Sequence, residues 1–288
     1  MVGLSASIET FQALYFVWRF VATEEVNDMQ PEHYHKTVAG CRISIRHAGQ
    51  GAPLLFLHGA GGASRWEPFM DELSDRHHVI VPEHPGFGES EMPGWLDNVG
   101  DLAYFYLDFL EDAGLSDVNL VGCSLGGWIA AEIAVRQSRR LKSLTLVAAA
   151  GLSLPDTPKG DVFIWSPEER IRNVYADQSI ADAILAQPLS EEQQNLQLRN
   201  NLAFARVAWQ PRLFNPDLHK WLHRIDTPTL LLWGEQDKII PAAFGPAYRS
   251  LIPNAELVTF PNCGHAPQIE SKERFVSEID ALIGRARS

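Results

Sequence analysis

The chain has 288 residues, of which 45% are hydrophobic and 21% charged, a composition that fits one large globular domain. A formal net charge of -12, with no run of basic residues, argues against a nucleic-acid partner. The three cysteines, Cys41, Cys123 and Cys263, have no paired spacing, so we predict neither a disulfide framework nor a zinc site, and we expect a reducing, cytoplasmic location.

Residues 1–35 precede the first clear strand pattern and are predicted to form an N-terminal extension, helical in part. Its most apolar stretch, FQALYFVWRFVA from Phe11, is interrupted by Arg19 and is too short to span a membrane. No basic residue precedes it, as the start of a signal peptide would require. Two interpretations stay open: a helix that packs on the surface, or translation from Met29 with residues 1–28 dispensable.

From residue 36 onward, short apolar runs alternate with helical patterns, which predicts βαβ units and a mostly parallel sheet. A hairpin pattern covers 36–49. Continuous apolar runs, typical of strands buried on both faces, follow at 52–59, 77–86, 118–124, 141–150, 227–234 and 255–261. Amphipathic patterns predict helices at 99–115, 126–138 and 271–286.

Residues 152–225 interrupt this alternation, because they hold no strand pattern and are too long for an ordinary connection. The stretches 166–178 and 190–209 are predicted helices, and each opens with a serine followed three residues later by Glu or Gln, the capping-box pattern. We therefore predict a helical cap over 152–225, inserted in a core formed by 36–151 and 226–288.

The decapeptide NLVGCSLGGW, residues 119–128, joins a predicted strand to a predicted helix and contains G-x-S-x-G. In that motif the serine occupies a strained turn that requires tiny neighbours two positions away on each side. Gly122 and Gly126 provide them for Ser124. Cys123 would instead be flanked by Val121 and Leu125, so the register selects Ser124 as the nucleophile.

Two later strand ends supply partners for a serine nucleophile, which needs a base and a group to orient it. Asp237 follows the strand at 227–234, with Glu235 as a nearby competitor, and His265 follows the strand at 255–261. The order Ser, Asp, His along the chain is the one expected for the α/β-hydrolase sheet. We predict a triad of Ser124, His265 and Asp237.

A glycine-rich loop, LHGAGGA at 57–63, ends the strand at 52–59 and exposes backbone N–H groups that can stabilise an oxyanion. We predict that the N–H groups of Ala60 and Leu125 form the oxyanion hole. The loop lacks the lysine and spacing of a phosphate-binding loop. His219 and His223 have a metal-ligand spacing but no third ligand, so we expect no metal and no organic cofactor.

The motifs HGAGG, HPGFGES, GCSLGG, GEQDKIIP and NCGHAPQIE occur in this order, and with them the sequence resembles the α/β-hydrolase superfamily from about residue 36 to the end. The resemblance implies the same triad, with the insertion as a lid. The stretch HGAGGASRW is also similar to carbon-carbon hydrolases that cleave ring-fission products of aromatic degradation. Those enzymes generally carry Asn before the nucleophile and Trp after the catalytic histidine, where this chain has Cys123 and Ala266.

Aromatic residues of the insertion, Phe163, Trp165, Trp209 and Phe214, are candidates either for the substrate pocket or for the cap's own core. We predict substrate contacts for Gly59, Trp66, Trp165 and Trp209. Arg206 and Arg212 are predicted either to meet a substrate carboxylate or to lie on the surface.

The predicted function is hydrolysis of a small to medium carboxylic ester, a small-molecule substrate, through an acyl-enzyme on Ser124. One alternative is a carbon-carbon hydrolase of the meta-cleavage-product type. Another is a non-catalytic ligand-binding protein with the same fold. The oligomeric state is left open between monomer and homodimer.

Overall fold

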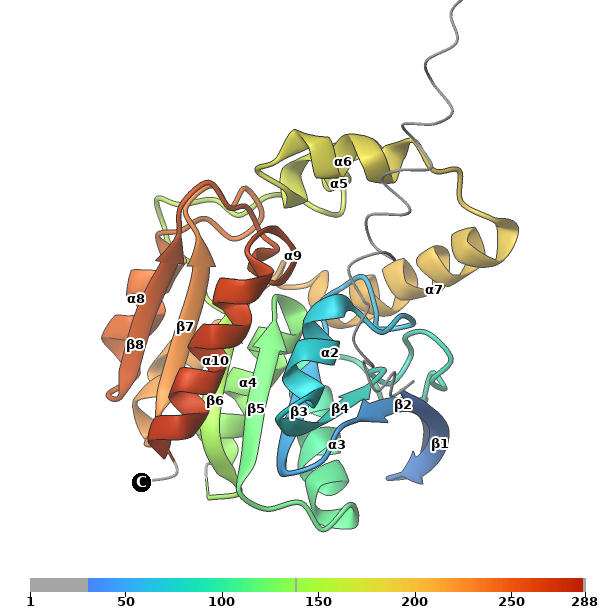
Figure 1. Cartoon of the computed structure of the whole chain (residues 1–288). Coiled ribbons are helices and arrows are strands. Elements are labelled where there is room, and N and C mark those ends of the chain that lie inside the picture. Colours follow the sequence, from blue (N-terminus) through green and yellow to red (C-terminus); the bar gives the residue numbers. More distant parts are fainter. Residues whose placement is uncertain (1–30, 138, 287–288) are drawn as a thin grey trace, which may run out of the picture. The chain divides into compact units, whose positions relative to one another are not determined.

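Eight strands form one sheet, in the order β1-β2-β4-β3-β5-β6-β7-β8, in the computed structural model, which describes residues 31–137 and 139–286 (Figure 1). Strands β1 and β2 pair as an antiparallel hairpin, β2 is antiparallel to β4, and all later pairs are parallel. The predicted mostly parallel sheet is confirmed. The strands are Glu32–Val38, Cys41–Ala48, Ala52–Leu57, His77–Pro82, Val118–Cys123, Leu141–Val147, Thr229–Gly234 and Ala255–Phe260, numbered β1 to β8.

Helices cover both faces of the sheet, which explains why the central strands are continuous apolar runs. Every residue of β5 and of β7 is buried. Alternate strand residues enter two apolar clusters. One cluster packs against α3 (Val99–Asp112), α4 (Leu125–Arg136) and α8 (Phe244–Leu251), the other against α2 (Pro68–Ser74) and α10 (Lys272–Ala286).

The interval between β6 and β7 is helical, as predicted, and its three α-helices lie at the edge of the sheet where the parallel strands end (Figure 1). It holds α5 (Pro167–Val174), α6 (Gln178–Leu185), α7 (Glu191–Ala208) and two 3-10 turns, Leu218–Lys220 and Leu222–Arg224. Both predicted capping boxes are confirmed, since Ser166 and Ser190 accept from the backbone three residues on. The helix predicted over 166–178 ends at Val174, and α6, a separate helix capped by Asp177, was missed.

The boundary of the N-terminal extension is corrected by the structure. Strand β1 begins at Glu32, so residues 32–35 belong to the sheet and not to a helical extension. Their pattern was missed because β1 lies at the edge of the sheet and is largely solvent-exposed. The predictions for residues 1–30 lie outside the described part of the chain. Among the described residues, none of the helices combines the length and the apolar composition that a membrane span requires.

Candidate active site

The turn between β5 and α4 places Ser124 in a conformation that L-residues rarely adopt, with φ 54° and ψ -111°. Glycines flank it because the backbone leaves no room for side chains. A Cβ on Gly122 would lie 2.3 Å from the carbonyl oxygen of Gly126, and one on Gly126 would lie 2.0 Å from that of Leu57. The steric requirement predicted from the sequence is met, and Ser124 stands at the first turn of α4, whose N-terminal dipole favours negative charge.

Cys123, the alternative nucleophile, ends β5 and is only 6% exposed. Burial raises the pKa of its thiol well above the ordinary value, so the reactive thiolate is disfavoured at neutral pH. Although the residue touches the pocket described below, its environment suits a protonated, packed thiol.

Asp237 and His265 meet from the loops that follow β7 and β8. The Nδ1 atom of His265 lies 2.8 Å from Oδ2 of Asp237, whose side chain is fully buried. The other oxygen, Oδ1, accepts hydrogen bonds from the backbone N–H groups of Ile239 and Ile240 at 2.8 and 2.9 Å. With Nδ1–H donated to the carboxylate, Nε2 of His265 is left as the proton acceptor.

The His265 loop is fixed to the helical interval by Glu270 of the short helix α9 (Pro267–Glu270). Its carboxylate accepts hydrogen bonds from the N–H groups of Gly264 and Ala176, both at 2.7 Å. The N–H of His265 itself donates to the carbonyl of Val174, at the end of α5, at 2.7 Å. The backbone beside His265 is therefore held from two sides.

Ser124 and His265 line one pocket of about 540 Å³, together with Gly59 and Ala60 of the glycine-rich loop. A Cβ on Gly59 would lie 3.4 Å from Cβ of Ser124, so the loop passes directly beside the serine. Among the described residues, the N–H groups of Ala60 and Leu125 donate to no protein acceptor. That is the condition expected of donors kept for a bound oxyanion.

A pair of buried, stacked imidazoles supports the glycine-rich loop. His58 donates from Nδ1 to the carbonyl of Gly59 at 2.7 Å and accepts at Nε2 from the N–H of His84 at 3.0 Å. His84 donates from Nε2 to the carbonyl of His58 at 2.9 Å and accepts from the Tyr106 hydroxyl at 2.6 Å. Burial lowers the pKa of His58 to about 4, so both of its ring nitrogens act as in a neutral imidazole.

The hydrogen bond from His58 to the carbonyl of Gly59 also sets the direction of the Ala60 N–H. In a trans peptide the N–H points away from the preceding carbonyl, and the carbonyl of Gly59 is held by His58 and by the N–H of Gly62. The geometry therefore turns the Ala60 N–H to the opposite side of the peptide.

Four residues were predicted to contact the substrate. Gly59 lines the pocket, whereas the three tryptophans do not. Trp66 donates to Asp71, Trp165 packs against the main apolar cluster, and Trp209 lies edge-on to Phe163 with 45% of its surface exposed. The structure thus turns the three tryptophans away from this pocket, a direction that composition does not reveal. The walls are instead formed by aliphatic residues, Phe204 and Tyr175, with a polar group that includes Arg170, Gln193, Gln197, Asn200, Asn201 and Gln268.

Arg170 is the pocket's basic residue on the helical interval, a position that the sequence suggested for Arg206 or Arg212. Arg206 is bound to the carbonyl of Leu96 and to Asp97, and Arg212 pairs with Asp161. Arg170 donates from Nη1 to Asn201 at 2.7 Å, while its buried Nε has no hydrogen-bond partner among the described residues. Burial lowers the pKa of this guanidinium, a cost that a bound anion would offset.

Comparison with known proteins shows similarity along most of the chain. The profile of the Alpha/beta hydrolase family matches residues 54–278. A 2-hydroxymuconate semialdehyde hydrolase of Pseudomonas sp. strain CF600 is 30% identical over 276 residues, which cover 86% of this chain and 92% of that protein. A pimeloyl-[acyl-carrier protein] methyl ester esterase of Nitrosomonas europaea is 30% identical over 261 residues, 83% of this chain and 99% of that protein.

Among solved structures, a membrane phospholipase A described as a bacterial virulence factor superposes with a TM-score of 0.76 at 26% identity. The match covers 97% of this chain and 96% of that one. Both the fold and the order of its elements are thus shared with hydrolases that differ in the bond they cleave.

Proposed function

Because the chain belongs to the alpha/beta hydrolase family, we propose that it is a serine hydrolase in which Ser124 is the nucleophile, His265 the base and Asp237 the group that orients the base. The hydroxyl of Ser124 transfers its proton to Nε2 of His265 as the oxygen attacks a carbonyl carbon. The N–H groups of Ala60 and Leu125 stabilise the oxyanion, and each such donor contributes about 3 kcal/mol to transition-state stabilisation. Residues 152–225 act as the cap that closes the pocket.

We propose carbon-carbon bond cleavage in an acidic ring-fission product as the reaction. The single observation that carries this choice is Arg170: it lines the pocket, its buried Nε has no hydrogen-bond partner among the described residues, and a guanidinium at this place suits a substrate carboxylate. The full-length similarity to a 2-hydroxymuconate semialdehyde hydrolase supports it. In the keto tautomer of such a product, which forms when the carbon next to the attacked carbonyl is protonated, collapse of the oxyanion breaks the bond to that carbon, and the electron pair leaves as a conjugated dienolate. The leaving dienolate takes the proton from His265, and water then releases the acid from Ser124.

Ester hydrolysis is the second candidate, and two pocket residues favour it. Cys123 and Ala266 line the pocket at the positions where the carbon-carbon hydrolases generally carry Asn and Trp. The similarity to a methyl ester esterase points the same way. In this reaction the alcohol leaves as the oxyanion collapses, with the same proton from His265.

The two reactions are separated by measuring kcat/KM for both substrate classes on one preparation. Loss of the dienolate absorbance reports cleavage of 2-hydroxymuconate semialdehyde, and release of p-nitrophenol reports esters from acetate to laurate. We expect a higher kcat/KM for 2-hydroxymuconate semialdehyde than for any of the esters. Ser124→Ala should abolish both reactions. A higher value for an ester would assign ester hydrolysis, and no turnover by folded protein would support a non-catalytic binder.

A further inference from the structure

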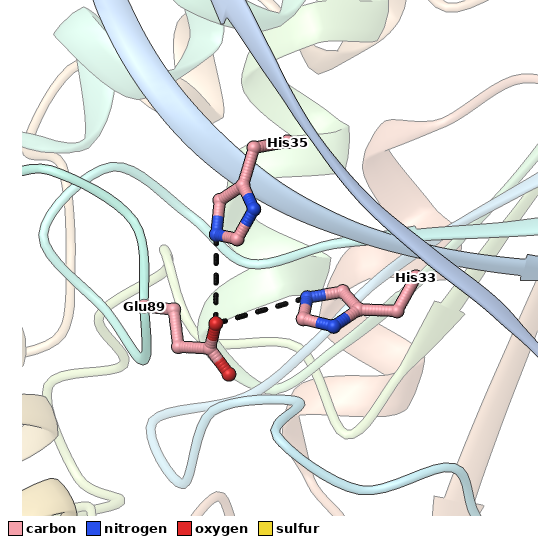
Figure 2. Close-up of side chains that lie close together, drawn as sticks. All are labelled: His33, His35 and Glu89. Atoms are coloured by element: carbon pink, nitrogen blue, oxygen red, sulfur yellow. Dashed lines mark ion pairs between the residues drawn. The ribbon is translucent and has the colours of Figure 1, made fainter.

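Two histidines of the edge strand β1 and one glutamate of the loop after β4 converge outside the pocket (Figure 2). His33 and His35 are two residues apart on a strand, so their side chains lie on the same face. Figure 2 shows both rings turning a nitrogen toward one carboxylate oxygen of Glu89. The distances from this Oε2 atom to the two Nε2 atoms are 3.8 Å for His33 and 3.5 Å for His35.

We propose that His33, His35 and Glu89 bind a divalent transition-metal ion of the zinc class. Zinc prefers imidazole nitrogen and carboxylate oxygen at about 2.0–2.2 Å in tetrahedral geometry, which sets two ligand atoms about 3.4 Å apart. The two nitrogen–oxygen separations are close to this value, and all three donor atoms lie within 4.8 Å of one another. Small side-chain rotations would complete three protein ligands, and a water would complete the tetrahedron.

The loop that carries Glu89 is already held in place, so the donors need little reorganisation. The N–H of Glu89 donates to Glu83 at 2.8 Å, and the N–H of Ser44 in β2 donates to Ser90 at 3.0 Å. Arg46 lies 3.7 Å from the other oxygen of Glu89, Oε1, which leaves Oε2 to face the histidines. This is the arrangement by which neighbouring groups orient a metal ligand.

Two contacts weaken the site without blocking it. The Ser44 hydroxyl lies 3.0 Å from Nε2 of His33 and has to give up that contact when the nitrogen binds metal. The guanidinium of Arg46 repels a cation, so we expect weaker binding than in a structural zinc centre. His33 and Glu89 are solvent-exposed, which gives the ion a path of entry.

The opposite face of the hairpin provides a matched control, because it has the same residue types without convergent donors. Nδ1 of His47 contacts Nε2 of His78 at 3.2 Å, whereas Glu32 approaches the other nitrogen of His47, Nε2, at 3.4 Å. The described residues therefore form an imidazole pair there that offers no three-donor site.

The test is titration of chelator-treated protein with Zn²⁺ near neutral pH by isothermal calorimetry. We expect one site, with at least tenfold weaker binding in Glu89→Gln and in His35→Asn and unchanged binding in His47→Asn. Zn²⁺ should also raise the melting temperature of the wild type but not that of Glu89→Gln, which replaces an exposed side chain. The proposal is overturned if the wild type binds no Zn²⁺, or if Glu89→Gln binds it as tightly as His47→Asn does.

Discussion

At the scale of single residues, burial assigns different tasks to chemically similar groups. His265 lies in the pocket with one nitrogen on Asp237, whereas His58 is fully enclosed with both nitrogens engaged by the backbone. Arg170 and Arg206 are both on the helical interval, yet only Arg170 lines the pocket. The chemistry of a side chain follows from the partners that the fold gives it.

Replacing Arg170 by Met should weaken binding of acidic substrates selectively, since it removes a charge-assisted contact of about 1.5–3 kcal/mol. We expect a ten- to hundredfold higher KM for 2-hydroxymuconate semialdehyde and little change for a neutral p-nitrophenyl ester. Arg172→Met is the control, because Arg172 is on the same helix but pairs with Glu168 and Asp182. Equal effects of the two substitutions would contradict the assignment of Arg170.

The neutral state of His58 predicts a loss of stability in acid. The folded protein keeps this imidazole unprotonated down to its pKa of about 4, whereas the unfolded chain binds a proton near pH 6.5. Unfolding therefore takes up a proton between these values, so the free energy of unfolding decreases as pH falls from 6.5 to 4, by about 3 kcal/mol in total. Burial also lowers the pKa of His84, so His84 adds to this decrease in stability.

Urea unfolding at a series of pH values measures this contribution. The His58→Gln variant should show a shallower pH dependence than the wild type in that window, even though it starts from a lower stability. His219→Gln, which alters an exposed side chain, is the control. Parallel pH profiles for the wild type and His58→Gln would show that His58 does not titrate as proposed.

At the scale of elements, the turn between β5 and α4 is set by backbone packing. Helix α4 begins directly at the serine because two glycines let strand, turn and glycine-rich loop approach within contact distance. Glycine is not required for packing at Gly284 of α10. This residue is exposed, and a Cβ there would meet nothing within 4 Å.

Substitution by alanine should have opposite effects on stability at Gly126 and at Gly284. Gly126→Ala places a Cβ 2.0 Å from the carbonyl oxygen of Leu57 and should lower the free energy of unfolding by more than about 3 kcal/mol. Gly284→Ala should raise it by about 0.5–1 kcal/mol through helix propensity. Thermal and urea unfolding of both variants tests the pair, and a mild effect at Gly126 would refute the packing argument.

At the scale of the whole described unit, helix α7 joins the helical interval to the sheet through Asn200. Its Nδ2 donates to the carbonyl of Gly61 at 2.8 Å, and its Oδ1 accepts from the N–H of Gly88 at 2.8 Å. One buried amide thus links α7, the glycine-rich loop and the loop after β4, the segment that also carries Glu89.

Asn200→Ala should loosen this connection, because it leaves the buried N–H of Gly88 without a partner at a cost of about 1–3 kcal/mol. We expect lower stability and a lower kcat, since Gly61 belongs to the loop that carries Ala60. Asn195→Ala, at an exposed site on the same helix, should lower neither the stability nor kcat, because alanine favours the helix and the side chain lies in solvent. Urea unfolding and steady-state kinetics of the two variants test whether Asn200 links these segments. Equal results for the two variants would show that it does not.

Sequence patterns within a few residues predicted most of the strands and helices. Some features that depend on contacts between distant segments were not predicted. The glycines around Ser124 and the capping boxes at Ser166 and Ser190 are readable because their physical cause lies within a few residues. The placement of Arg170 in the pocket, and of Glu89 beside His33, depends on contacts between distant segments that leave no local pattern. Helix α6 was missed because it is short and follows α5 after three residues.

We propose Ser124, and not the neighbouring Cys123, as the nucleophile. The most direct test of this assignment is the intact mass of the protein after reaction with a fluorophosphonate, measured for the wild type, Ser124→Ala and Cys123→Ala. We predict one adduct on the wild type and on Cys123→Ala, and none on Ser124→Ala. An adduct on folded Ser124→Ala, or none on the folded wild type, would refute Ser124 as the nucleophile.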